Sequence, residues 1–151
     1  MKKLFSADYN DSSISVGLLV LRIGIGVLML LHGVPKMAGL FSDGPVQFPS
    51  VLGLSSELSL SLAVFAEVIC SVLLLVGFGT RIATIPLIIT MLVAVLYIHG
   101  NDPFAKQEMG IHYLLVYVLL LITGAGKYSL DHLLASTKRV PATKVAVYHS
   151  Y

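Results

Sequence analysis

The chain has 151 residues, of which 56% are hydrophobic and 12% are charged, and its mean hydropathy is +0.89. Soluble domains carry about 25% charged residues, so this composition excludes an ordinary soluble fold and predicts an integral membrane protein. The net charge of +2, with basic residues scattered around the apolar runs, argues against a nucleic-acid partner. A single cysteine, Cys70, excludes an internal disulfide and a cysteine-rich metal site.

Four apolar runs have the length of about 20 residues that a helix needs to cross the hydrocarbon core. They cover residues 15–36, 57–78, 81–99 and 109–126. We therefore predict an all-α, four-helix transmembrane bundle that forms a single domain over residues 15–135. Residues 1–14 are expected to form a cytoplasmic N-terminal segment, and residues 136–151 a flexible cytoplasmic tail. The first run is too long for the apolar part of a cleavable signal peptide, so we interpret it as a retained helix.

The connections between the runs set the topology. A tight, glycine-bearing turn at residues 77–81 predicts that the second and third helices are antiparallel neighbours. The connections at 36–56 and 100–108 are longer and read as surface loops. Most basic residues flank the ends that carry the termini and this tight turn, which favours an N-in, C-in arrangement in the bacterial inner membrane. After the last run, residues 127–135 form a short amphipathic segment with Leu130, Leu133 and Leu134 on one side.

Two ionisable residues, Arg22 and Glu67, lie inside apolar runs. A charge at the centre of a membrane helix is unfavourable by roughly 2.5–3.5 kcal/mol, so such residues face a bundle interior and find a partner. We expect Arg22 and Glu67 to pair with each other. Two interpretations of the pair stay open: a structural ion pair that fixes helix register, or a catalytic centre in a proton path or ligand pocket.

The helical phase supports an inward position for Arg22. At 100° per residue, five residues of the first run share one stripe, which is predicted to face the bundle: Ser15, Arg22, Met29, Gly33 and Lys36.

A second polar group gathers near the outer boundary of the predicted bundle. It consists of His32, Lys36, His99, Glu108 and His112, which we predict to form a ligand-binding layer. A quinone head group suits such a layer, because a histidine can hydrogen-bond a quinone carbonyl and couple reduction to proton uptake. A haem or metal ion is the alternative, although the spacing matches no recognised ligand motif. The neighbouring Tyr97, Tyr113 and Tyr117 are interpreted as interfacial anchors.

The order of these residues resembles the DoxX family of small bacterial membrane proteins. The resemblance is carried by Leu21-Arg22-Ile23-Gly24, Leu31-His32-Gly33 with Lys36, Glu67, Gly77-Phe78-Gly79-Thr80-Arg81, His99 and the segment from Gly124 to Asp131. It implies a four-helix inner-membrane protein similar to the small membrane subunit of thiosulfate:quinone oxidoreductase and related redox assemblies. It also implies functional roles for Arg22, His32, Lys36, Glu67 and His99.

Three functions therefore compete at the level of the sequence. The first is a redox component that binds a quinone or similar electron carrier in the polar layer, works with partner redox proteins, and uses Arg22 and Glu67 as its catalytic core. The second is a non-catalytic membrane subunit that docks soluble enzymes. The third is a small-molecule transporter, for which four helices are few unless the chain forms a homo-oligomer.

Overall fold

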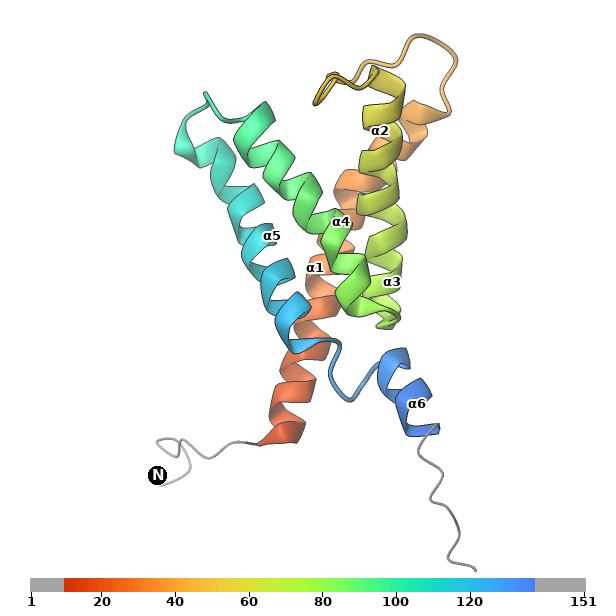
Figure 1. Cartoon of the computed structure of the whole chain (residues 1–151), viewed down its shortest axis with the longest axis vertical. Coiled ribbons are helices and arrows are strands. Elements are labelled where there is room, and N and C mark those ends of the chain that lie inside the picture. Colours follow the sequence, from red (N-terminus) through yellow and green to blue (C-terminus); the bar gives the residue numbers. More distant parts are fainter. Residues whose placement is uncertain (1–9, 138–151) are drawn as a thin grey trace, which may run out of the picture.

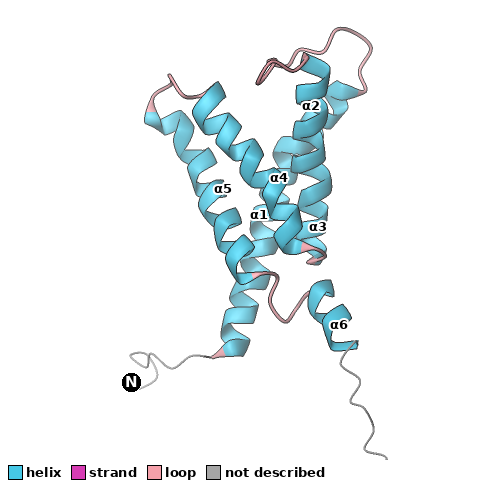
Figure 2. Cartoon of the chain, in the orientation of Figure 1, coloured by secondary structure: helices cyan, strands magenta, loops and turns pink. Residues whose placement is uncertain are grey.

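The computed structural model describes residues 10–137, which form helices and contain no strand (Figures 1 and 2). Four spans are long and apolar enough to cross a membrane. They are α1 (Asp11–Leu40), the run of α2 (Ser56–Val64), η2 (Phe65–Cys70) and α3 (Ser71–Val76), the pair α4 (Thr80–Leu92) and η3 (Val93–Ile98), and α5 (Phe104–Thr123). A short helix, α6 (Leu130–Thr137), follows. The predicted all-α, four-span architecture is confirmed.

The first and fourth helices differ from their expected bounds for identifiable reasons. The first helix begins at Asp11 because the side chain of Asn10 caps it, accepting hydrogen bonds from the amides of Ser12 and Ser13. It also continues through Pro35 to Leu40. The fourth span starts at Phe104, directly after Pro103, and ends before Gly124, whose φ of +78° suits glycine. Residues 104–108, which include the polar Lys106, Gln107 and Glu108, therefore belong to its first turns, and the apolar pattern could not reveal this.

Both η2 and η3 are π-helical segments within otherwise α-helical spans. A π-helical turn carries more residues than an α-helical turn and is found frequently at functional sites. The first contains Glu67, and the second ends immediately before His99. Two predicted site residues thus lie in or beside these segments.

The two ends of the bundle differ. We call the end with the 41–55 and 99–103 connections the connection end, and the end with the start of α1 and the Gly77–Gly79 turn the terminal end. The α1 helix packs against α2, η2 and α3, while α4 packs against α5, η2 and α3. Within residues 10–137, α2 and η3 share no extensive contact. Accordingly, α4 and α5 diverge from α1 and α2 toward the connection end (Figure 1).

The core lies between the four spans and includes Met29, Leu74, Leu87, Tyr117 and Leu120. The stripe predicted for the first helix is confirmed: its buried residues are Ser15, Arg22, Gly26, Met29 and Gly33, with Lys36 half-buried. Large apolar side chains remain exposed around every span, as expected for a surface in contact with lipid tails. In α6, Leu130, Leu133 and Leu134 are exposed, which is typical of a helix that lies at a membrane surface.

Candidate functional site

Arg22 and Glu67 do not pair with each other, contrary to expectation. Arg22 is 1% exposed, and its guanidinium donates hydrogen bonds of 2.8 Å to the carbonyl oxygens of Ala125 and Tyr128. These carbonyls belong to the segment between α5 and α6. Arg22 therefore ties the first span to the segment that follows the last one.

The first turn of α6 caps α4. Asp131 accepts hydrogen bonds from the amides of Gly79 and Thr80 at 2.7 and 3.0 Å, and its own amide donates to the carbonyl of Gly77. A carboxylate at the amino end of a helix is favourable there. We call Arg22, Asp131 and their partners the terminal clasp.

The helix register explains why the expected pair does not form. A Cβ on Gly77 would lie 2.4 Å from Nη1 of Arg22, whereas a Cβ on Gly33 would lie 2.9 Å from the backbone of Glu67. Arg22 is therefore level with the turn after α3, and Glu67 is level with Gly33. At 1.5 Å per residue, the two levels are about 16 Å apart along α1. The expected pairing assumed that the start of the first helix and the turn after α3 lie at the same level. In the structure α1 begins about 16 Å before Arg22, and Arg22 itself is level with that turn.

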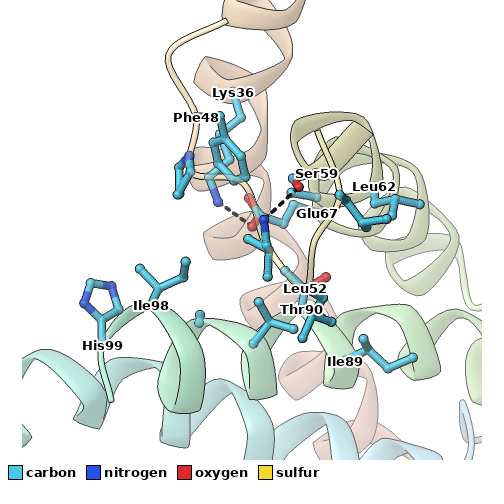
Figure 3. A pocket seen from close by; sticks show the side chains of 16 residues that line it. Lys36, Phe48, Leu52, Ser59, Leu62, Glu67, Ile89, Thr90, Ile98 and His99 are labelled. Atoms are coloured by element: carbon cyan, nitrogen blue, oxygen red, sulfur yellow. Dashed lines mark hydrogen bonds and ion pairs between the residues drawn. The ribbon is translucent and has the colours of Figure 1, made fainter. Parts of the chain in front are cut away.

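Glu67 instead forms an ion pair with Lys36, at 2.5 Å between Oε1 and Nζ. The side chain of Glu67 is 2% exposed and that of Lys36 is 35% exposed. Lys36 reaches the carboxylate because it lies one helical turn beyond Gly33, where α1 and η2 approach closely. It also lies 5.9 Å from the ring centroid of Phe48 (Figure 3).

The second carboxylate oxygen, Oε2 of Glu67, is buried and has no hydrogen-bond partner within residues 10–137. Leaving a buried acceptor unpaired typically costs about 1–3 kcal/mol, and more for a charged group. Such an exception in a native structure points to strain, a catalytic role, or a molecule that completes the bonding. The position beside a cavity favours the last two explanations.

Two adjoining cavities open at the connection end. The first, of about 350 Å³, lies between the 46–54 segment, α2, η2 and α4–η3 (Figure 3). The second, of about 460 Å³, lies between α1, η3 and the start of α5. Lys36, Glu67 and His99 line both cavities. We call the two cavities together the cleft and these three residues its junction; each volume falls within the range of small-molecule sites.

His99 is oriented by a carboxylate that the sequence did not single out. Its Nδ1 lies 2.8 Å from Oδ2 of Asp102, and because a carboxylate only accepts, Nδ1 is the donor and Nε2 is left for a ligand. The hydrogen bond from His99, with Lys106 at 3.6 Å, lowers the pKa of Asp102. Gln107 fixes the same turn by donating to the carbonyl oxygens of His99 and Asp102.

His32 lines the second cavity, and its ring packs edge-on against Tyr113 at 5.9 Å between centroids. Tyr113 in turn lies 6.0 Å from Tyr117. Tyr117 is fully buried, and Tyr113 is nearly so, so the interpretation of these two tyrosines as interfacial anchors was wrong. Tyr97 is exposed and keeps that interpretation.

Glu108 and His112 are exposed and line neither cavity. The structure thus brings His32, Lys36, Glu67 and His99 of the predicted layer to one cleft and leaves the other two on the outer surface of α5. Across residues 10–137, no group of three His, Cys, Asp or Glu side chains is close enough to hold a metal ion. The geometry of the described residues therefore gives no support to the metal alternative.

The segment between α1 and α2 covers the first cavity. Phe48, Val51 and Leu52 line that cavity, and the amide of Val51 donates to Oγ of Ser59 at 3.1 Å. Leu52 has a φ of +54°, a conformation that is unfavourable for a leucine. We call residues 46–54 the cover. The sequence offered no periodicity from which this position could be predicted.

The chain is similar to known proteins over most of its length. The family model DoxX matches residues 17–100. Over 122 residues the chain is 30% identical to the Bacillus subtilis (strain 168) protein named "Putative oxidoreductase CatD", covering 80% of this chain and 89% of that protein. Over 125 residues it is 33% identical to "Inner membrane protein YphA" of Escherichia coli (strain K12), covering 76% and 87%. No solved structure matches the chain.

Proposed function

The chain belongs to the DoxX family of multi-pass inner-membrane proteins, and on that premise we propose that it is a redox component that binds a quinone or similar electron carrier at the junction. One observation carries the proposal: a buried carboxylate with an unpartnered oxygen and a carboxylate-oriented imidazole line the same cleft. The name of the relative CatD supports an oxidoreductase reaction class.

The junction offers groups that suit quinone chemistry. Reduction of a quinone to a quinol takes up two electrons and two protons, and oxidation releases them. Oε2 of Glu67 can accept a hydrogen bond from a quinol hydroxyl, and Nε2 of His99 can receive its proton because Asp102 holds Nδ1. Lys36 binds the other carboxylate oxygen, Oε1, and so fixes the position of the group. The electrons pass to or from a partner redox protein.

The proposal divides the predicted site residues into two groups. The ligand contacts the junction residues Lys36, Glu67 and His99, and His32 lines the second cavity beside it. Arg22 holds the terminal end together and acts on the ligand only through the fold, because both of its hydrogen-bonded partners are backbone carbonyls far from the cleft. Glu108 and His112 make no contact with the ligand.

Equilibrium binding of a tail-less dimethoxy-methyl-benzoquinone to the purified chain in lipid nanodiscs tests the proposal. We expect Glu67→Gln and His99→Ala each to raise Kd by about tenfold or more, since a hydrogen bond to a charged group contributes roughly 1.5–3 kcal/mol. Glu57→Gln is the matched control, because Glu57 is an exposed carboxylate in the first turn of α2. Its Kd should equal that of the wild type.

Two results would contradict the proposal. The quinone could fail to bind the wild type, or it could bind all variants equally. The first result, combined with stable retention of a soluble enzyme during purification, would favour the docking function instead.

We also propose that both termini face the cytoplasm, which places the connection end and the cleft on the periplasmic side. Asp43 and Lys127 are exposed at opposite ends of the bundle. The variants Asp43→Cys and Lys127→Cys, each made together with Cys70→Ala to remove the native thiol, therefore report the orientation. In intact cells a membrane-impermeant maleimide should label Asp43→Cys alone. Labelling of Lys127→Cys alone would reverse the topology.

A further inference from the structure

We infer that the cleft takes its ligand from within the bilayer, through a gap between α2 and α4, and that the ligand therefore carries an apolar tail which occupies the first cavity. This inference rests on the proposed function, whose ligand class it narrows. Three features support it: the position of the gap, the unequal chemistry of the two cavities, and the cover.

The walls of the gap are exposed apolar side chains. Leu62 on α2 and Ile89 on α4 both line the first cavity, yet they are 51% and 54% exposed. A residue that lines a cavity and is also half exposed lies at the rim of an opening. Because α2 shares no extensive contact with either α4 or η3 among the described residues, helix packing does not close this rim.

The opening lies within the hydrocarbon layer. Ile89 is nine residues from either end of the Thr80–Ile98 span, so its backbone is near the centre of that span. Leu62 lies six residues, or about 9 Å, inside the start of α2. Both side chains therefore face acyl tails, and the opening leads to lipid.

The two cavities differ in chemistry and meet at the junction. Apart from the junction, the first is lined mainly by apolar side chains such as Val51, Leu62 and Ile89. The second includes His32, Lys106 and Gln107. A molecule with a polar ring and an apolar tail fits this arrangement in one orientation, with the ring at the junction and the tail in the first cavity. The second cavity then supplies water and protons to the ring.

The cover restricts access to the first cavity from the connection end. Phe48, Val51 and Leu52 all line that cavity, and the hydrogen bond from Val51 to Ser59 pins the cover to α2. Phe48 also packs over the ammonium of Lys36. A water-soluble ligand would have to displace these contacts, whereas a ligand dissolved in lipid reaches the cavity between α2 and α4.

The test compares two quinones with the same dimethoxy-methyl ring, one without a tail and one with a decyl tail, on the chain in nanodiscs. Leu62→Trp and Ile89→Trp fill the gap. Leu58→Trp and Ile85→Trp are matched controls: each lies four residues away on the same helix, is 47% exposed and does not line the cavity. We expect the gap variants to weaken binding of the decyl quinone by about tenfold, or roughly 1.4 kcal/mol, and to leave the tail-less quinone and both controls unchanged.

A second pair of variants guards against misfolding of the tryptophan proteins. Leu62→Ala and Ile89→Ala widen the gap and should speed association of the decyl quinone without changing that of the tail-less one. Gap variants that behave like their controls would overturn the inference and leave the proposed function standing. A phospholipid that the wild type retains and Leu62→Trp loses, with quinone binding unchanged, would assign the cavity to an acyl chain and also overturn it. Failure of both quinones to bind would overturn the proposed function together with the inference.

Discussion

A charged side chain is buried near each end of this bundle, and the two charges are stabilised by different kinds of partner. At the terminal end, Arg22 is tied to two backbone carbonyls and lies close to Asp131, in a region where the chain folds back on itself. At the connection end, Glu67 is paired with Lys36, and its second oxygen, beside a cavity, has no partner in the part of the chain that the structure describes. Each group keeps one buried atom without a hydrogen-bond partner within residues 10–137, Nε of Arg22 and Oε2 of Glu67. Of the two residues, only Glu67 lines the cleft, so only its unpartnered atom lies beside a space that a ligand can occupy.

This difference shows how a structural charge is distinguished from a charge that binds a ligand. Burial does not separate Arg22 from Glu67, since both are 1% exposed. The separating features are the partners and the nearby space. Backbone carbonyls cannot exchange protons or leave, so the terminal clasp suits a fixed role. A half-exposed lysine and a cleft allow the bonding of Glu67 to change when a ligand arrives.

The largest expected effect belongs to the terminal clasp. Arg22→Met removes two hydrogen bonds from a charged donor and should lower the free energy of unfolding by about 3 kcal/mol. The matched control is Arg81→Met, because Arg81 also donates to a backbone carbonyl, that of Ile122, but is exposed; its effect should be within about 0.5 kcal/mol. Denaturant unfolding in mixed micelles measures both. If Arg22→Met lost quinone binding without losing stability, Arg22 would have to be assigned to the ligand site.

Substitution of Lys36 and substitution of Glu67 should lower the stability of the chain by different amounts. Lys36→Met leaves a buried carboxylate without its cation and should destabilise the chain by about 2 kcal/mol. Glu67→Gln leaves only a lysine that can turn toward solvent, so its effect on stability should be below about 1 kcal/mol. The same unfolding measurement compares them. Equal losses would mean that the pair acts as a second clasp rather than as a binding site.

The close approach of α1 and η2 at Gly33 holds Lys36 near Glu67. The addition of a single methyl group at Gly33 tests whether this approach is needed. In Gly33→Ala the Cβ would meet the backbone of Glu67 at 2.9 Å, whereas in Gly24→Ala it meets nothing within 4 Å. Overpacking should make Gly33→Ala less stable by about 1–2 kcal/mol, and Gly24→Ala should be neutral or slightly more stable. Thermal unfolding of the two variants decides the matter, and similar values would show that α1 and η2 do not need this close approach.

The smallest effect concerns the orientation of His99. The hydrogen bond from His99 lowers the pKa of Asp102, so the bond stabilises the folded chain above the ordinary Asp value of about 3.9. That stabilisation is lost as the pH falls through the lowered pKa. Asp102→Asn should therefore unfold at a lower temperature than the wild type at pH 7, and this difference should disappear as the pH falls through the lowered pKa of Asp102. A difference in unfolding temperature that does not vary with pH would show that the hydrogen bond between Asp102 and His99 does not stabilise the fold.

Much of the fold followed from the sequence, because the spans are set by apolar length and the inward stripe of the first helix by its phase. The site followed only in part. Arg22, Glu67, Lys36 and His99 were identified because charge and imidazole are unusual near hydrocarbon. The pairing could not be predicted, since it depends on how the first helix is shifted along its axis relative to the turn after α3, and no sequence pattern reports that shift. Asp102 and Phe48 also escaped notice, because loop positions carry no periodicity.

The account depends most directly on where a quinone binds. A tail-less quinone carrying an azide can be photoactivated on the chain in nanodiscs and its adducts mapped by mass spectrometry. We predict adducts on residues that line the cleft, within 59–67 and 89–99, and their loss in Glu67→Gln. Adducts that concentrate at the terminal end, around the cavity lined by Ser15 and Ser129, or that persist unchanged in Glu67→Gln, would contradict the assignment of the cleft as the redox site.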